Sequence, residues 1–149
     1  MNSPEILFLD DDPEKAAAAL CDQDLKFAVI SAAAIASTVN GGPNRANWPG
    51  HPIAVWAAEG ISNYNWLIAY GKQAAYEYSV RFDQEVRQLS TLFLLEVPAV
   101  QLPKGGSPFP RSTPAVFGAD NVHASRYYYQ TRLLKATWTN TEPPEWWAK

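Results

Sequence analysis

The chain has little cysteine and no long hydrophobic run. Cys21 is the one cysteine among 149 residues, so no disulfide can form within the chain, and a reducing compartment suits it. No apolar run approaches the ~20 residues that cross a bilayer. We also find no basic-then-apolar segment with a cleavage site that would indicate a signal peptide. We therefore expect a cytoplasmic protein that does not engage a membrane.

The motifs of several enzyme classes are missing as well. His51 and His123 are the only histidines, and with a single cysteine they give no metal-ligand spacing. The acidic run 10–12 could hold a hard cation, although helix capping explains it better. The glycine-rich segment 40–45 lacks the preceding strand and the Gly-Lys-Ser/Thr ending of a phosphate loop, and no serine lies in a nucleophile elbow. We predict no metal, no cofactor and no catalytic residue.

Aromatic residues, by contrast, make up 13% of the chain, and hydrophobic residues make up 47%. This composition is globular, and the length is that of one domain, which we place over 1–149. The net charge of −3 weakens a nucleic-acid-binding interpretation, because such binding depends on Lys and Arg. A local basic patch stays open as a prediction, formed from Arg45, Lys72, Arg81, Arg87, Arg126, Arg132 and Lys135.

Capping signals and hydrophobic spacing predict an all-α fold of about five helices. Asp12 is placed to cap a short helix over 14–20, with a proline at its first position. Small and apolar residues at helical spacing predict a helix over 24–39. Its alanines permit close packing, so we expect it to be buried on more than one side. These alanines are Ala28, Ala32, Ala33 and Ala36.

Two more helices are predicted in the middle of the chain. His51 can cap a short helix over 53–59, because the following proline disfavours helical geometry at residue 51. Ser62 is predicted to cap a longer helix that runs to about residue 85. The segment 86–97 either continues this helix or forms another.

The C-terminal third combines an irregular connection with a last helix. Prolines and glycines make 98–118 a long loop. The last helix is predicted from residue 120 or 121 to about Trp138. The tail 139–149 contains the adjacent Trp146 and Trp147. We expect this pair to dock onto the body, because exposed tandem tryptophans are costly in water.

The candidate recognition site lies between residues 48 and 81. Rings interleaved with Asn and Arg can stack on a base and read it, although an aromatic core is the commoner arrangement. Helix N-termini near His51 and Asn63 suit an anion. The predicted binding residues are His51, Trp56, Asn63, Trp66 and Arg81. In the competing interpretation the first and third only cap helices and the tryptophans fill the core.

Short collinear segments across nearly the whole chain resemble a family of small tailed-phage proteins. They are Leu9–Pro13, Ala16–Ala17, Leu20–Asp22, Ser37–Thr38, His51–Pro52, Trp56, Asn63–Tyr64, Trp66–Leu67, Glu77–Tyr78, Arg81–Phe82, Ser125–Tyr128, Lys135–Trp138 and Pro144–Trp146. That family in turn resembles the helical pyrimidine-dimer DNA glycosylases, through an early helix, a His-Pro segment and a helix with Glu-x-x-x-Arg. The resemblance implies a helix-borne glutamate, an amine nucleophile and a flipped nucleotide.

The chain departs from this pattern where the resemblance implies catalysis. The family's second helix carries His, Lys, Glu and Gln after the Cys-Asp pair. Here the segment 24–34 is nearly all small or apolar, and Ser31 stands at the glutamate position. The family's later helix bears a histidine near its end, whereas 82–86 has none. The acid–base set is therefore largely absent, so this member has lost the catalysis or never shared that mechanism.

Three functions follow as hypotheses, and the sequence favours a non-enzyme. The first is a non-catalytic or catalytically reduced phage-type accessory protein that binds a partner protein or a nucleotide-like ligand. The second is a DNA base-processing glycosylase or lyase. The third is a nucleotide-sequestering anti-defence protein. A protein partner, or a second copy, is expected on the alanine-rich helix or on the C-terminal tryptophan pair.

Overall fold

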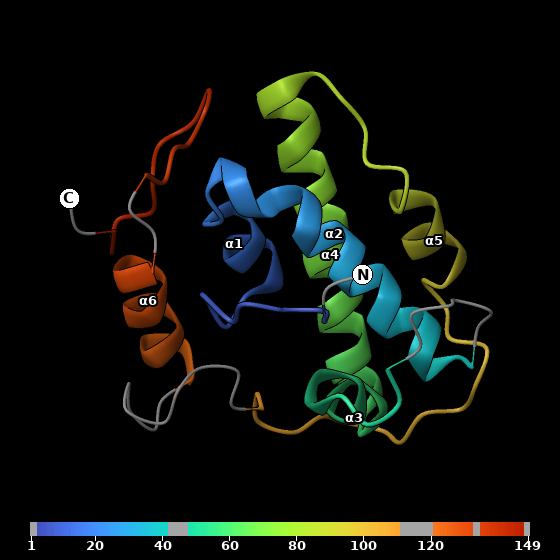
Figure 1. Cartoon of the computed structure of the whole chain (residues 1–149). Helices are drawn as coiled ribbons and strands as arrows, with labels where there is room; N and C mark the ends of the chain where they lie inside the picture. Colours follow the sequence, from blue (N-terminus) through green and yellow to red (C-terminus); the bar gives the residue numbers. More distant parts are fainter. Residues whose placement is uncertain (1–2, 42–47, 111–120, 133–134, 148–149) are drawn as a thin grey trace.

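The computed structural model describes residues 3–41, 48–110, 121–132 and 135–147. Within these residues the fold is all-α, as the sequence predicts, and contains no strand. In Figure 1, α4 runs through the centre with α2 crossing it, while α5 and α6 lie on opposite sides. The described helices are α1 (Pro13–Ala18), α2 (Asp22–Val39), α3 (Pro52–Ala58), α4 (Ile61–Phe82), α5 (Leu89–Leu94) and α6 (Asn121–Arg132).

The alanine-rich helix α2 is the most enclosed element, and the prediction of burial on more than one side is confirmed. Every residue from 31 to 37 is buried, which a helix with one solvent face could not achieve. Helices α3, α4 and α5 all contact it. Its small side chains thus allow the other helices of this chain to pack closely against it.

Local capping signals place α1 as predicted. The Asp12 Oδ1 accepts hydrogen bonds from the backbone N–H groups of Glu14 (2.8 Å) and Lys15 (3.2 Å), and Pro13 occupies the first helical position. An aspartate cap of this kind satisfies N–H groups that have no partner inside the helix. The acidic run is therefore explained in part by capping.

The start of α4 corrects the prediction that Ser62 caps this helix. Gly60 is the N-cap residue. The backbone N–H groups of Ile61 and Ser62 donate to the carbonyls of Pro103 (2.8 Å) and Gly105 (2.9 Å). A Cβ at Gly60 would stand 2.2 Å from the Gly105 oxygen, so only glycine allows this approach. A distant loop, and not a local side chain, caps the helix.

The predicted ends of the later helices also change. Asp83 adopts a left-handed conformation with φ of 53°, which ends α4 and makes α5 a separate helix. The helix α6 ends at Arg132 and does not reach Trp138. The indole Nε1–H of Trp138 instead donates to the Ala19 carbonyl (3.1 Å). The alternative cap at residue 120 lies outside the described residues.

One hydrophobic core connects the N-terminal segment 6–9 with residues from all of the described helices. Trp146 and Trp147 pack against this core, which confirms that the tail docks onto the body. The Trp147 ring meets the Trp138 ring edge-on, with centroids 4.9 Å apart. None of the described helices has the length and apolar character needed to cross a membrane.

Candidate functional site

The two predicted tryptophans lie in an aromatic cluster inside the molecule. Trp56 is 2% exposed, and its ring meets Phe8 edge-on at 5.3 Å. Trp66 is half-buried and stacks on Tyr70 at 5.3 Å. Phe109, from the long loop, stacks on Phe8 at 4.4 Å. These rings use their faces and edges on one another, an arrangement that stabilises a core.

His51 caps α3, as predicted, and also binds the N-terminal segment. The backbone N–H of Ile53 donates to His51 Nδ1 (3.1 Å), and His51 Nε2 lies 2.9 Å from the Pro4 carbonyl oxygen. Because Nδ1 accepts a hydrogen bond, Nε2 carries the ring proton and donates a hydrogen bond to the Pro4 carbonyl. Both ring nitrogens are therefore engaged within the chain.

Asn63 holds the loop that caps α4. Its Nδ2 donates to the Trp56 carbonyl (2.8 Å) and to Ser107 Oγ (2.9 Å), while its Oδ1 accepts from the Ser107 N–H (3.0 Å). The buried amide is thus fully bonded to protein groups. With the first N–H groups of α4 already bonded to loop carbonyls, this helix start offers few free donors to the predicted anion.

Arg81 is a buried structural cation near the other end of α4. Its Nη1 donates to the Leu20 carbonyl (2.8 Å) and to Asp22 Oδ1 (3.2 Å). Its Nη2 donates to the Ala18 carbonyl (3.1 Å) and to Glu77 Oε1 (3.1 Å). Glu77 lies four residues before Arg81 on α4, a spacing that allows an ion pair. The Arg81 side chain in this pair is 0% exposed and that of Glu77 is 15% exposed.

The five predicted binding residues therefore do not form one site. Asn63 and Arg81 are eighteen positions apart on α4, or ~27 Å at 1.5 Å per residue. Trp56 and Asn63 meet at the α3–α4 junction, and His51 lies at the opposite end of α3. Arg81 binds the end of α1 and the start of α2. Their role in recognition stays a prediction that has to be tested by binding.

Asp22 collects hydrogen bonds beside Arg81. Its carboxylate accepts from Thr137 Oγ1 (2.8 Å) and from both the backbone N–H (3.0 Å) and Oγ1 (2.6 Å) of Thr139. Burial raises the pKa of Asp22, but these hydrogen bonds and Arg81 outweigh it and hold the pKa below its ordinary value. This carboxylate anchors the C-terminal segment to α2.

The lone cysteine belongs to a second buried polar group. Tyr129 of α6 donates its hydroxyl to Asp24 Oδ2 (2.7 Å) and accepts from the Cys21 backbone N–H (2.9 Å). Burial raises the pKa of the Cys21 thiol. A protonated, buried thiol is a poor nucleophile. The group fastens α6 to the start of α2.

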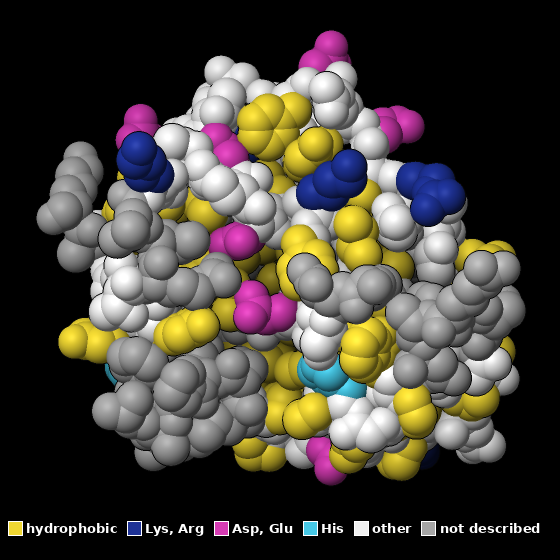
Figure 2. Space-filling model, viewed as in Figure 1, with side chains coloured by type: hydrophobic (Ala, Val, Ile, Leu, Met, Phe, Trp, Pro, Cys, Tyr) yellow, Lys and Arg dark blue, Asp and Glu magenta, His cyan; other side chains and the backbone are white. Residues whose placement is uncertain are grey.

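Three members of the predicted basic patch are engaged within the chain. Lys72 pairs with Glu96, Arg126 pairs with Asp10 at 3.2 Å, and Arg81 is buried. The Lys and Arg side chains visible in Figure 2 stand apart from one another. Arg45 and the side chain of Arg132 lie outside the described residues. No group of three or more His, Cys, Asp or Glu side chains suited to a metal occurs in the described part.

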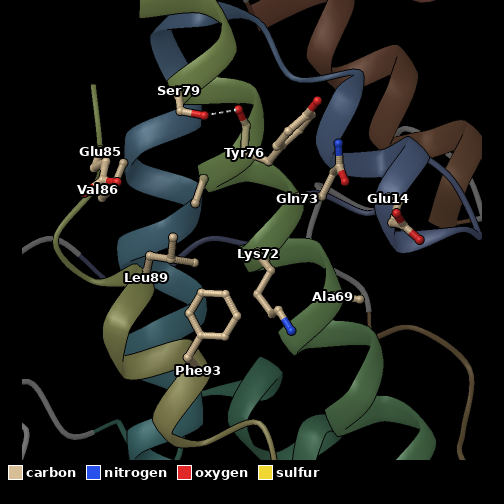
Figure 3. Close-up of a pocket in the computed structure, with 11 residues that line it drawn as sticks. Glu14, Ala69, Lys72, Gln73, Tyr76, Ser79, Glu85, Val86, Leu89 and Phe93 are labelled. Atoms are coloured by element: carbon tan, nitrogen blue, oxygen red, sulfur yellow. Dashed lines mark hydrogen bonds between the residues drawn. The ribbon is translucent and has the colours of Figure 1, made fainter. Parts of the chain in front are cut away.

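A groove of about 520 Å³ lies over the outer face of α4, between α1 and α5. Figure 3 shows Lys72 of α4 beside Phe93 of α5, whereas the Tyr76 ring points away from α5, toward the side of α1. The exposed fractions of Tyr76 and Phe93 are 61% and 56%. The Lys72 ammonium lies 4.8 Å from the centre of the Phe93 ring, a cation–π contact. The groove thus has aromatic walls that the core does not use.

The sequence carried only a weak signal for this groove. The spacing of α4 separates Tyr76 from the buried positions, but α5 is a short helix with apolar residues at most positions. Which of them face solvent depends on how the turn after Asp83 orients α5. Comparisons with protein-family models, curated proteins and solved structures found no match to this chain.

Proposed function

We propose that the chain is a non-catalytic accessory protein of phage type, whose groove between α4 and α5 binds a partner protein. One observation carries the proposal. Tyr76 of α4 and Phe93 of α5 both line the groove and are 61% and 56% exposed. We place the protein in the host cytoplasm, in keeping with its unpaired Cys21.

Large apolar side chains grouped around a groove favour a protein contact. Isolated exposed hydrophobic residues are ordinary, but a contiguous set with a polar rim is typical of an interaction surface. Aromatic residues supply much of the binding energy at such surfaces. The groove is favoured over the other surfaces expected for a partner because residues 31–37 of α2 are buried and the half-buried Trp146 and Trp147 pack against the core.

The internal bonding of the polar residues supports a binding role over catalysis. Glu77, which the glycosylase resemblance would make catalytic, is paired with the buried Arg81. Ser31, at the position of the glutamate on the family's second helix, is buried and accepts a hydrogen bond from the Glu5 N–H (3.0 Å). The glycosylase and nucleotide-sequestering alternatives remain open to the assays described below and to direct binding tests.

Site-specific photo-cross-linking tests the proposal. A benzophenone amino acid replaces Tyr76 in the groove, and in the matched control it replaces Val55 of α3, which is 49% exposed. Irradiation in cells of the natural source is expected to join a protein to position 76 and not to position 55. Equal labelling at both positions, or an adduct with a nucleotide only, would contradict the proposal.

A further inference from the structure

Two carboxylates stand on opposite sides of the groove. Figure 3 shows Glu14 on α1 at one side and Glu85, in the connection after α4, at the other. Both are exposed, and neither forms an ion pair with any of the described residues. Lys72, the one cation among the described lining residues, is already paired with Glu96. The rim therefore offers two carboxylates that form no ion pair, with the exposed Arg87 beside Glu85 in an adjoining hollow.

The lining between these carboxylates is mostly apolar, although it also includes Gln73 and Ser79. Its apolar members include Ala69, Ala75, Val86 and Leu89, and the rings of Tyr76 and Phe93 rise at its sides. An occupant that matches this surface needs apolar side chains along one face and positive charges at its edges. Complementary charge also guides the encounter of partners, and like charges oppose it. The net charge of −3 also favours the approach of a positively charged partner.

We propose that the groove binds a basic amphipathic helix of the partner protein. This inference rests on the proposed function, because it names the chemistry of the partner at the same groove. A helix fits better than an added strand, since the described residues contain no sheet edge for a strand to join. Apolar residues at positions i, i+3, i+4 and i+7 of the partner enter the groove, and flanking Lys or Arg side chains reach Glu14 and Glu85.

Two synthetic peptides test the charge and shape of the occupant. Both carry leucine at i, i+3, i+4 and i+7 in a helix-forming sequence, and they differ only in having lysine or glutamate at the flanking positions. Fluorescence anisotropy of labelled peptides measures Kd with the full-length protein at low and high salt. The lysine peptide is expected to bind at least ~10-fold more tightly at low salt. This preference should shrink as salt screens the charges.

Substitutions inside and outside the groove test whether the peptide binds there. Glu14→Gln with Glu85→Gln is expected to remove most of the preference for the lysine peptide. Glu142→Gln, which removes an exposed carboxylate outside the groove, should preserve it. Tyr76→Ala with Phe93→Ala is expected to weaken binding by at least ~10-fold, whereas Val55→Ala leaves it unchanged. Circular dichroism of each variant confirms that the helices are retained, as expected for exposed side chains.

The outcomes separate the two proposals. If the glutamate peptide binds as tightly as the lysine peptide, the basic character of the partner is overturned. If neither peptide binds while position 76 still cross-links a protein, the amphipathic helix is overturned and the binding function stands. If neither peptide binds and position 76 labels nothing, both proposals fall. A lysine preference that depends on Glu14 and Glu85 supports the inference.

Discussion

Gly71 of α4 lies directly against Ala32 of α2. A Cβ added at Gly71 would stand 2.7 Å from the Ala32 Cβ and 2.7 Å from Leu92 Cδ1 of α5. Real Cβ atoms do not approach this closely, so the two helices are as close as their backbones permit. Both residues are buried, and the crossing of the two longest helices depends on their small size.

Replacing Gly71 with alanine is expected to destabilise the fold by roughly 1–3 kcal/mol, because the new methyl group overpacks the crossing. Ala32→Leu should have a similar effect from the other side. Urea unfolding measures the change. Gly50→Ala is the matched control, since an added Cβ there meets nothing within 4 Å. Equal stability of the Gly71 and Gly50 variants would show that the crossing can relax.

Removing the buried Arg81 guanidinium is expected to lower the free energy of unfolding more than the Gly71 or Ala32 substitution does. Arg81→Ala leaves Asp22 and Glu77 without their shared cation, and breaking such a buried pair costs roughly 3–5 kcal/mol. The stability of Arg81→Lys should lie between that of Arg81→Ala and that of the wild type, because one ammonium group keeps the charge but cannot replace the planar set of guanidinium donors. Thermal and urea unfolding test both, with the exposed Arg87→Ala as control. A folded Arg81→Ala protein that lost only a ligand would instead support a recognition role.

The stability of the protein should depend on Asp22 in a defined pH range. Its pKa in the folded state lies below the ordinary value of 3.8, so the carboxylate stabilises the fold above that value. The contribution is lost as the pH falls through the lower folded pKa. We expect Asp22→Asn to be less stable than the wild type at pH 7, and the difference to narrow below pH 3.8.

Urea unfolding at a series of pH values measures this difference. Glu142→Gln, which removes an exposed carboxylate from the same C-terminal segment, controls for the loss of one negative charge. A difference between the wild type and Asp22→Asn that stays constant down to pH 2 would contradict the assignment to this carboxylate.

We expect no DNA glycosylase or strand-cleaving activity. The acid–base residues that the phage-family resemblance implies are largely absent from α2, and Glu77 is held by Arg81. Ultraviolet-damaged and abasic duplexes, incubated with the protein and separated on denaturing gels, test this expectation. Reproducible nicking that disappears in Glu77→Gln would contradict it and favour the glycosylase hypothesis.

The sequence predicted the elements whose signals are local. Asp12 and His51 cap the helices that follow them, because a capping side chain binds N–H groups two or three residues away. The start of α4 could not be found in this way. Its N–H groups bind carbonyls of Pro103 and Gly105, and no local pattern around Ser62 reports a loop that arrives from later in the chain.

The candidate site was predictable only in part, because contacts with distant segments decide which of its residues are buried. Sequence reasoning singled out Trp56 and Trp66 for their aromatic character, yet ring chemistry is the same in a core and in a binding surface. Burial decides between these roles, and it depends on Phe8 and Phe109, which come from distant segments. The groove wall at Phe93 likewise depends on how α5 is oriented, which the left-handed turn at Asp83 allows.

The attachment of α6 has a consequence for the order in which the molecule can be assembled during translation. The bond between Cys21 and Tyr129 spans 108 residues, and those from Asp22 to Thr139 span 117. A ribosome must therefore synthesise and release the chain through residue 139 before all of these partners meet. Contacts among α1 to α5 become possible much earlier. Until Thr139 emerges, the surface around Cys21 and Asp22 is open to chaperones and proteases.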